Sequence, residues 1–209
     1  MQDDLFIKSL SRDLKPRISI VPSQRPLFFW AVATFFILVF GVLWHSMRPD
    51  VSDRLSEGSY YFEIFSGLTV GIIAAGSALL TRIPGTRAPL KVIGSSILIW
   101  LGSMIWHSLS MKASGLRFDA HDAFACMTSI LVFSLLPGLL LFGLVKRGAT
   151  TQPQLSFALV AIAMTSAAAA FLPLACGNDG LFHLMFGHAL PLFILGTVGW
   201  FSGRLALRW

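Results

Sequence analysis

The chain has 209 residues, of which 55% are hydrophobic and only 12% are charged, whereas soluble domains carry about 25% charged residues. A soluble fold of this size would lack the polar groups needed to cover its surface, so we expect lipid to contact much of it. The net charge of +6 does not indicate direct nucleic acid binding, because the basic residues lie in short connectors between apolar runs and form no continuous stripe.

The first 25 residues are polar and lack the early apolar run of a cleavable signal peptide. Within them, residues 3–15 predict a short amphipathic helix that carries Phe6, Leu10 and Leu14 on one face. A helix of this length is not stable alone in water. Its apolar face therefore needs a surface, which is either the membrane or a groove on a soluble partner.

Six apolar runs follow this tail, each long enough to cross a hydrocarbon core of roughly 30 Å as a helix. Helices are expected because a membrane strand would show short alternation of apolar and polar residues. The sequence thus predicts an all-α, polytopic membrane protein, with a cytoplasmic tail at 1–25 and a bundle of six transmembrane helices at 26–209. The predicted spans are 27–44, 60–80, 90–106, 123–145, 155–174 and 181–203.

The distribution of Lys and Arg predicts the orientation of the spans. Twelve of the sixteen lie in the tail, in the second and fourth connectors and at the C-terminal end, whereas four lie on the opposite side. Seven of the ten acidic residues show the reverse preference. Because basic residues accumulate on the cytoplasmic side of a membrane, we expect both termini in the cytoplasm.

Small residues recur at four-residue spacing on the second and sixth predicted spans. Such ridges let helices approach one another closely within a membrane. They therefore predict where the bundle packs, and they carry no information on function. The positions are Gly67, Gly71, Ala75, Gly199 and Gly203.

With this orientation, all five histidines and both cysteines lie at or near the outer face. Thiolates and imidazoles are the ligands that soft and borderline metal ions prefer, but the chain has neither a CxxC nor an HExxH motif. His183 and His188 are five residues apart, so they are not expected to share one tight face of an α-helix. The candidate metal ligands beside the cysteines are His121, His183, His188 and Asp179.

Two further residues near this face have more ordinary interpretations. His107, like His45, ends a span beside a tryptophan, which is typical of an interfacial belt. Glu63 lies about one turn inside the second span. A carboxylate there can face the bundle, but this close to the interface we expect it to extend to water.

Three interpretations of Cys126 and Cys176 are open. They can form a structural disulfide, because the outer compartment is oxidising and the number of cysteines is even. They can be a thiol pair that senses oxidants or soft metals, because the thiolate is the species that is oxidised and that binds such ions. They can also be buried and inert. A labile disulfide would suit the first two interpretations.

Several short motifs occur in a distinctive order along the chain. The tail contains Asp3-Asp4-Leu5, Leu10 and Asp13-Leu14-Lys15-Pro16. One cysteine lies on the fourth span, and the other ends the run Leu172-Pro173-Leu174-Ala175-Cys176. A polar break, His183 and Gly187-His188-Ala189-Leu190-Pro191 follow. Over its whole length this pattern resembles the bacterial NrsF family, the negative regulators of sigma F.

The resemblance implies an anti-sigma factor of the bacterial inner membrane, not an enzyme, that holds an extracytoplasmic-function sigma factor inactive. It implies that Cys126 and Cys176 sense oxidants or heavy metals, with no required cofactor beyond a transient soft or borderline metal ion. It also implies that the tail binds the sigma factor. The contact residues expected there are Asp4, Leu5, Leu10, Asp13 and Leu14.

Two other functions remain open at this point. A membrane thiol–quinone oxidoreductase would use a reactive cysteine pair, but such enzymes generally accept electrons through a CxxC motif, which the chain lacks. A small transporter fits the number of spans. It also predicts ionisable residues at the middle of the membrane, and the sequence places none there.

Overall fold

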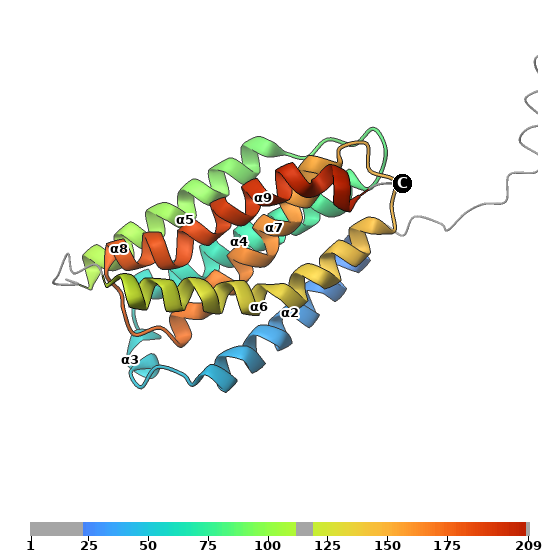
Figure 1. The fold of residues 1–209 in the computed structure, drawn as a ribbon. Coiled ribbons are helices and arrows are strands. Elements are labelled where there is room, and N and C mark those ends of the chain that lie inside the picture. Colours follow the sequence, from blue (N-terminus) through green and yellow to red (C-terminus); the bar gives the residue numbers. More distant parts are fainter. Residues whose placement is uncertain (1–22, 112–118, 208–209) are drawn as a thin grey trace, which may run out of the picture.

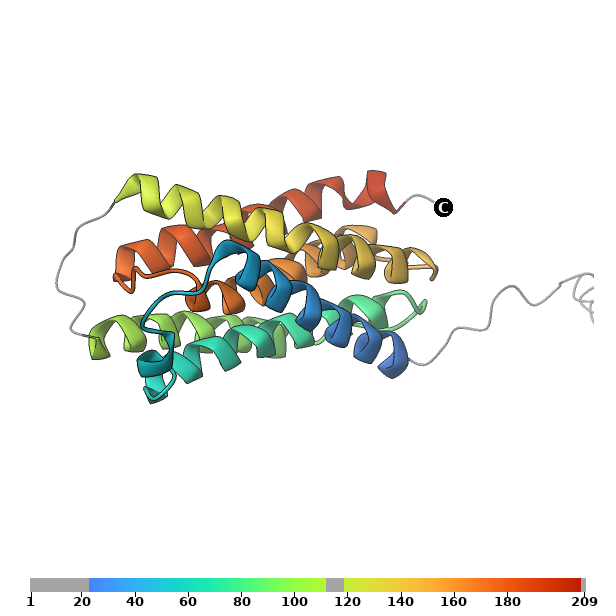
Figure 2. The same cartoon turned by 90° about the horizontal axis from the view of Figure 1, so that it is seen from below.

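The computed structural model describes residues 23–111 and 119–207. In these residues the chain forms a bundle of long helices joined by short connectors, without a strand (Figures 1 and 2). The all-α fold class is therefore confirmed. The elements are α2 (Gln24–His45), α3 (Val51–Arg54), α4 (Gly58–Thr81), α5 (Leu90–Ser110), α6 (Ala120–Lys146), α7 (Pro153–Phe171), the 3-10 turn η1 (Leu172–Leu174), α8 (Leu181–His183), the π-helix η2 (Leu184–Ala189) and α9 (Leu190–Ala206).

All six predicted spans are confirmed. Within the described residues, six helical segments are long and apolar enough to cross a membrane, and each extends a predicted span at one or both ends. Large apolar side chains cover their outward surfaces, including Phe28, Phe36 and Phe40 on α2. Lipid stabilises such a surface, whereas water would not.

Helix α7 occupies the centre of the bundle, where it packs against α4, α6 and α9. Small residues occupy much of α7, so neighbouring helices approach its backbone closely. A Cβ atom on Gly71 of α4 would lie 3.3 Å from the Ala163 carbonyl oxygen, and one on Gly199 of α9 would lie 2.9 Å from that of Phe157. The small-residue ridges predicted on the second and sixth spans are thus confirmed as packing surfaces.

Helix α2 is the most peripheral of the six, because a smaller share of it is buried than of the other five spans. It lies across one side of the bundle in Figure 2. In its second turn Trp30 is buried, and the indole Nε1 donates a 2.9 Å hydrogen bond to the Pro137 carbonyl oxygen of α6. The buried residues recur every four positions along α2, so a single narrow face of this helix contacts the bundle.

Different segments of the chain lie at the two ends of the bundle. The start of α2 and the end of α9 lie at one end, as expected for an even number of spans (Figure 1). At the opposite end, which we call the cysteine end, lie the connectors 46–57 and 175–180 and the start of α6. The predicted tail helix lies outside the described residues, and so do the predicted contacts Asp4, Leu5, Leu10, Asp13 and Leu14.

Candidate thiol and imidazole site

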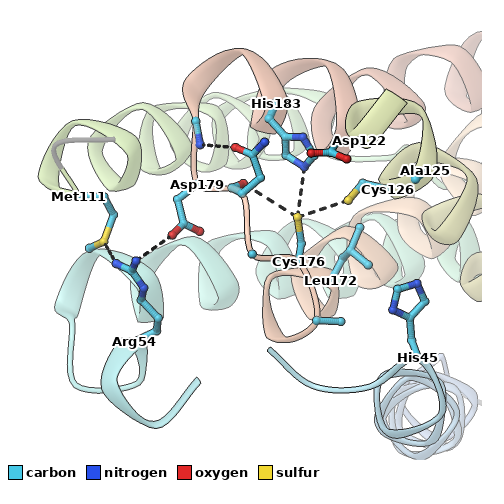
Figure 3. Close-up of a pocket in the computed structure, with 14 residues that line it drawn as sticks. His45, Arg54, Met111, Asp122, Ala125, Cys126, Leu172, Cys176, Asp179 and His183 are labelled. Atoms are coloured by element: carbon cyan, nitrogen blue, oxygen red, sulfur yellow. Dashed lines mark hydrogen bonds and ion pairs between the residues drawn. The ribbon is translucent and has the colours of Figure 1, made fainter. Parts of the chain in front are cut away.

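The two cysteines meet at the cysteine end, although 50 residues separate them. Cys126 lies in the second turn of α6. Cys176 follows η1, whose tight turn lets the Cys176 amide donate to the Leu172 carbonyl oxygen at 2.8 Å. Both cysteines are free thiols, and their Sγ atoms are 3.3 Å apart (Figure 3). The pair is therefore close enough to react with one partner or with each other.

Two histidines complete this cluster because the chain forms a π-helix between them. His183 Nε2 lies 3.2 Å from Cys176 Sγ, and the rings of His183 and His188 contact each other with centroids 5.4 Å apart. A π-helix has i→i+5 bonds, so residues five apart share a face. The expectation that these histidines would not share a face was wrong, because it assumed α-helical spacing.

Pro191 explains why the widened turn occurs where it does. A proline inside an α-helix has no amide to donate, and its ring clashes with the carbonyl four residues earlier, which here belongs to Gly187. Widening the preceding turn, Leu184–Ala189, relieves this clash and lets the helix continue as α9. The same proline therefore ends the regular spacing and brings His188 to the cysteines.

The four side chains Cys126, Cys176, His183 and His188 each offer one ligand atom, and these atoms lie within 4.8 Å of one another. His183 and His188 are buried, with exposed fractions of 2% and 0%. Among the described residues, neither ring nitrogen of His188 has a hydrogen-bond partner, and the same holds for His183 Nδ1. A buried polar group without a partner is costly, so these nitrogens favour a ligand.

The electrostatics favour an ionised thiol at Cys176, which lies in the connector after α7. The adjacent Cys126 thiol, and then His183 and His188, lower the pKa of Cys176, although burial opposes the shift. Because the thiolate is both the oxidisable and the metal-binding form, this residue is the more reactive of the two. A pocket of about 660 Å³, lined by Cys126, Cys176 and His183, gives access to it (Figure 3).

A partly buried ion-pair network, centred on the buried Arg48, adjoins the cluster and holds the Cys176 connector. Arg48, in the connector after α2, donates its backbone amide to the Leu174 carbonyl oxygen at 3.0 Å. Its guanidinium binds Asp179 at 2.9 Å and Asp50 at 2.7 Å. Arg54 also contacts both carboxylates, at 3.4 and 3.0 Å. The connectors 46–57 and 175–180 are thus joined by charge.

The pKa values of the two carboxyl groups report the strength of these contacts. The Arg48 guanidinium, with a smaller contribution from Arg54, lowers the pKa of Asp50 to about 2. Burial would raise the pKa of Asp179, but His107 and Arg48 hold it well below its ordinary value. Both carboxylates are therefore charged at neutral pH.

Acid is expected to destabilise the protein through this network. Both carboxyl pKa values are depressed in the folded state, so the stabilisation is complete above the unfolded pKa of about 3.9 and is lost as the pH falls below it. Thermal unfolding in detergent should show a smaller acid-induced fall for Asp179→Asn than for the parent. Asp53→Asn, in the connector 46–57 but outside the ion pairs described above, serves as the control and should match the parent. An equal acid response in all three proteins would contradict the prediction.

The structure separates the other candidate ligands from the four-residue cluster. The His121 side chain is 93% exposed and lies 3.9 Å from Asp122. Asp179 belongs to the ion-pair network instead, where it also contacts His107 at 3.6 Å. Of the four candidate ligands named from sequence, only His183 and His188 therefore join the cysteines.

Glu63 and His107 are buried, which corrects two expectations. Each has an exposed fraction of 1%, so Glu63 does not extend to water and His107 does not belong to an interfacial belt. Glu63 Oε2 lies 3.9 Å from His107 Nε2. The sequence carried a signal for this position, because Glu63 continues the four-residue spacing of Gly67 and Gly71 and so faces the bundle.

Comparison with known proteins adds one match. A family model described as NrsF, negative regulator of sigma F, matches residues 10–209, which include all six spans, both cysteines and both clustered histidines. No curated protein and no solved structure matches the chain.

Proposed function

The chain belongs to the NrsF family of negative regulators of sigma F, and we propose that it is an anti-sigma factor of the bacterial inner membrane with both termini in the cytoplasm. Its partner is a sigma factor, as the family implies, and we propose that this is one of the extracytoplasmic-function type. Cys126 and Cys176 sense an oxidant or a soft metal ion outside the cytoplasm, and the sigma factor is then released.

The observation that carries this proposal is the 3.3 Å separation of two free thiols with a histidine at 3.2 Å from one of them. A disulfide needs sulfur atoms about 2.05 Å apart, so closing the bond requires a movement of little more than about 1 Å. The Cys176 thiolate attacks a peroxide, which gives a sulfenic acid and hydroxide. The Cys126 thiolate then displaces a second hydroxide, and the S–S bond forms.

The Cys176 connector, Arg48 and α2 link this reaction to the tail. Bond formation draws the Cys176 connector toward α6. Arg48 joins that connector to the end of α2, and the start of α2 follows directly on the tail. A signal shifts an equilibrium only by its differential free energy for the two states. The disulfide supplies that difference, because the new bond ties the Cys176 connector to α6.

The direct test replaces Cys126 or Cys176 by Ser and measures transcription from a sigma-dependent reporter with and without peroxide or cadmium. We expect each variant to repress as the parent does and to lose induction down to the uninduced level. His121→Ala, an exposed residue at the same end, is the matched control and should be induced normally. Normal induction of both cysteine variants would remove the sensor role.

The proposed orientation has a separate test. After mild reduction, a membrane-impermeant thiol reagent applied to intact cells should label Cys126 or Cys176 through the pocket at the cysteine end. Labelling that appears only after the cells are opened would place the cysteines on the cytoplasmic side. In that case the tail and the thiols would lie on the same side of the membrane, and the thiols could not sense a signal outside the cytoplasm.

A further inference from the structure

We propose that the reduced site binds Zn²⁺, a borderline cation, through Cys126, Cys176, His183 and His188, and that disulfide formation expels this cation. The ion belongs to the reduced, repressing state. This deepens the proposed function, on which its regulatory consequence rests, whereas the binding reaction stands on the geometry of the site.

The separations between the ligand atoms suit a tetrahedral ion. Zinc–sulfur and zinc–nitrogen bonds of about 2.3 and 2.0 Å place the corners of a tetrahedron about 3.3–3.8 Å apart. The two Sγ atoms are 3.3 Å apart, His183 Nε2 is 3.2 Å from Cys176 Sγ, and all four ligand atoms lie within 4.8 Å of one another. Small adjustments therefore suffice for coordination, and two thiolates with two imidazoles form a donor set that zinc prefers.

His188 provides an independent indication of a ligand. Its side chain is fully buried, and in the described part of the chain neither ring nitrogen has a hydrogen-bond partner. The π-helix holds this ring against His183 and places it among the ligand atoms. A helix with α-helical spacing would place it elsewhere. A bound cation would satisfy one of these nitrogens and offset the cost of burying an imidazole.

The charges around the cluster are compatible with a dication. Two thiolates neutralise its charge. The nearby guanidinium of Arg48 is paired with Asp50 and Asp179, so its charge is already compensated. The pocket of about 660 Å³, with Asp122 in its lining, supplies an entry path.

Metal binding and disulfide formation exclude each other at this site. A peroxide that accepts two electrons from the two thiolates, with two protons, leaves one S–S bond and two waters. The cation then retains only two imidazole ligands and dissociates. Conversely, a bound cation holds both thiolates and slows their oxidation. Metal occupancy thus sets the oxidant concentration at which the switch responds.

The test uses Co²⁺ as a spectroscopic probe, added to the reduced full-length chain in detergent. We expect one equivalent to bind with the intense visible spectrum of tetrahedral, thiolate-bound cobalt, and Zn²⁺ to displace it. His188→Ala should weaken binding by more than about a hundredfold. His121→Ala, which removes an exposed histidine outside the cluster, should bind as the parent does.

The parent chain supplies a second measurement that needs no variant. Peroxide should release the cobalt, and reduction with a thiol should restore the spectrum. Octahedral cobalt, unchanged binding by His188→Ala, or binding that survives oxidation would each overturn the metal site. If cobalt does not bind but the cysteine variants still lose induction by peroxide, the metal site fails and the sensor function stands. If cobalt binds but those variants are induced normally, the metal site stands and the sensor function fails.

Discussion

Replacing Arg48 by Met is expected to destabilise the folded protein by about 3 kcal/mol, the lower part of the range for breaking a buried ion pair. The Arg48 side chain is only 2% exposed and binds Asp50 and Asp179 together. Methionine preserves most of the length of the side chain but removes every donor, so Asp179 keeps only its longer contacts with Arg54 and His107. Chemical unfolding in detergent measures the loss.

The matched control is Arg54→Met. Arg54 contacts the same two carboxylates, but its side chain is 25% exposed, and exposed ion pairs contribute at most about 1 kcal/mol. We expect this variant to lose less than a third as much stability as Arg48→Met. Equal losses would show that burial does not decide the strength of this network.

The same Arg48 variant tests the route from the thiols to α2. Without the guanidinium, the Arg48 amide still binds Leu174, directly before the connector that carries Cys176, and the connector itself keeps only the longer Arg54–Asp179 contact with the connector after α2. Oxidation should then still form the Cys126–Cys176 disulfide but should induce the reporter less than in the parent. A variant that folds, forms the disulfide and is fully induced would show that the signal leaves the site through α6 or α9 instead.

The arrangement of the bundle was predictable from composition and spacing because lipid imposes simple rules. Length and apolarity alone gave six spans, and the spacing of Gly67, Gly71, Gly199 and Gly203 gave the surfaces on which α4 and α9 pack against α7. These features depend on properties that each segment carries by itself. No knowledge of its neighbours is needed to recognise them.

The details of the site depend on contacts between distant segments, and these were predictable only in part. A similar depth for Cys126 and Cys176 followed from topology, but a separation of 3.3 Å did not. The π-helix was missed although Pro191 signalled an irregular turn, because a proline permits a kink or a widened turn alike. The pairing of Arg48 with Asp179 spans 131 residues, and several acidic residues on the same side were equally available in the sequence.

Deletion of residues 1–20 is expected to make sigma-dependent transcription constitutive, at the level that the parent reaches under full induction. The tail carries the predicted contacts Asp4, Leu5, Leu10, Asp13 and Leu14, and its predicted amphipathic helix needs a surface for its apolar face. Every tenfold loss of affinity corresponds to 1.4 kcal/mol, so removal of several apolar contacts is sufficient to free the partner. The reporter measures release, and co-purification of the sigma factor measures binding.

The orientation of the truncated protein should not change, because the deletion removes four of the twelve basic residues on the tail side and leaves eight against four. The double variant Leu10→Asp with Leu14→Asp keeps the full length and should release the partner in the same way. Its control is Arg17→Ala, which lies beyond the predicted helix and should repress normally. If the truncated chain still represses and still binds the sigma factor, the contact must lie in the rest of the chain that faces the cytoplasm in this topology, which comprises the connectors on the tail side of the bundle and the C-terminal end.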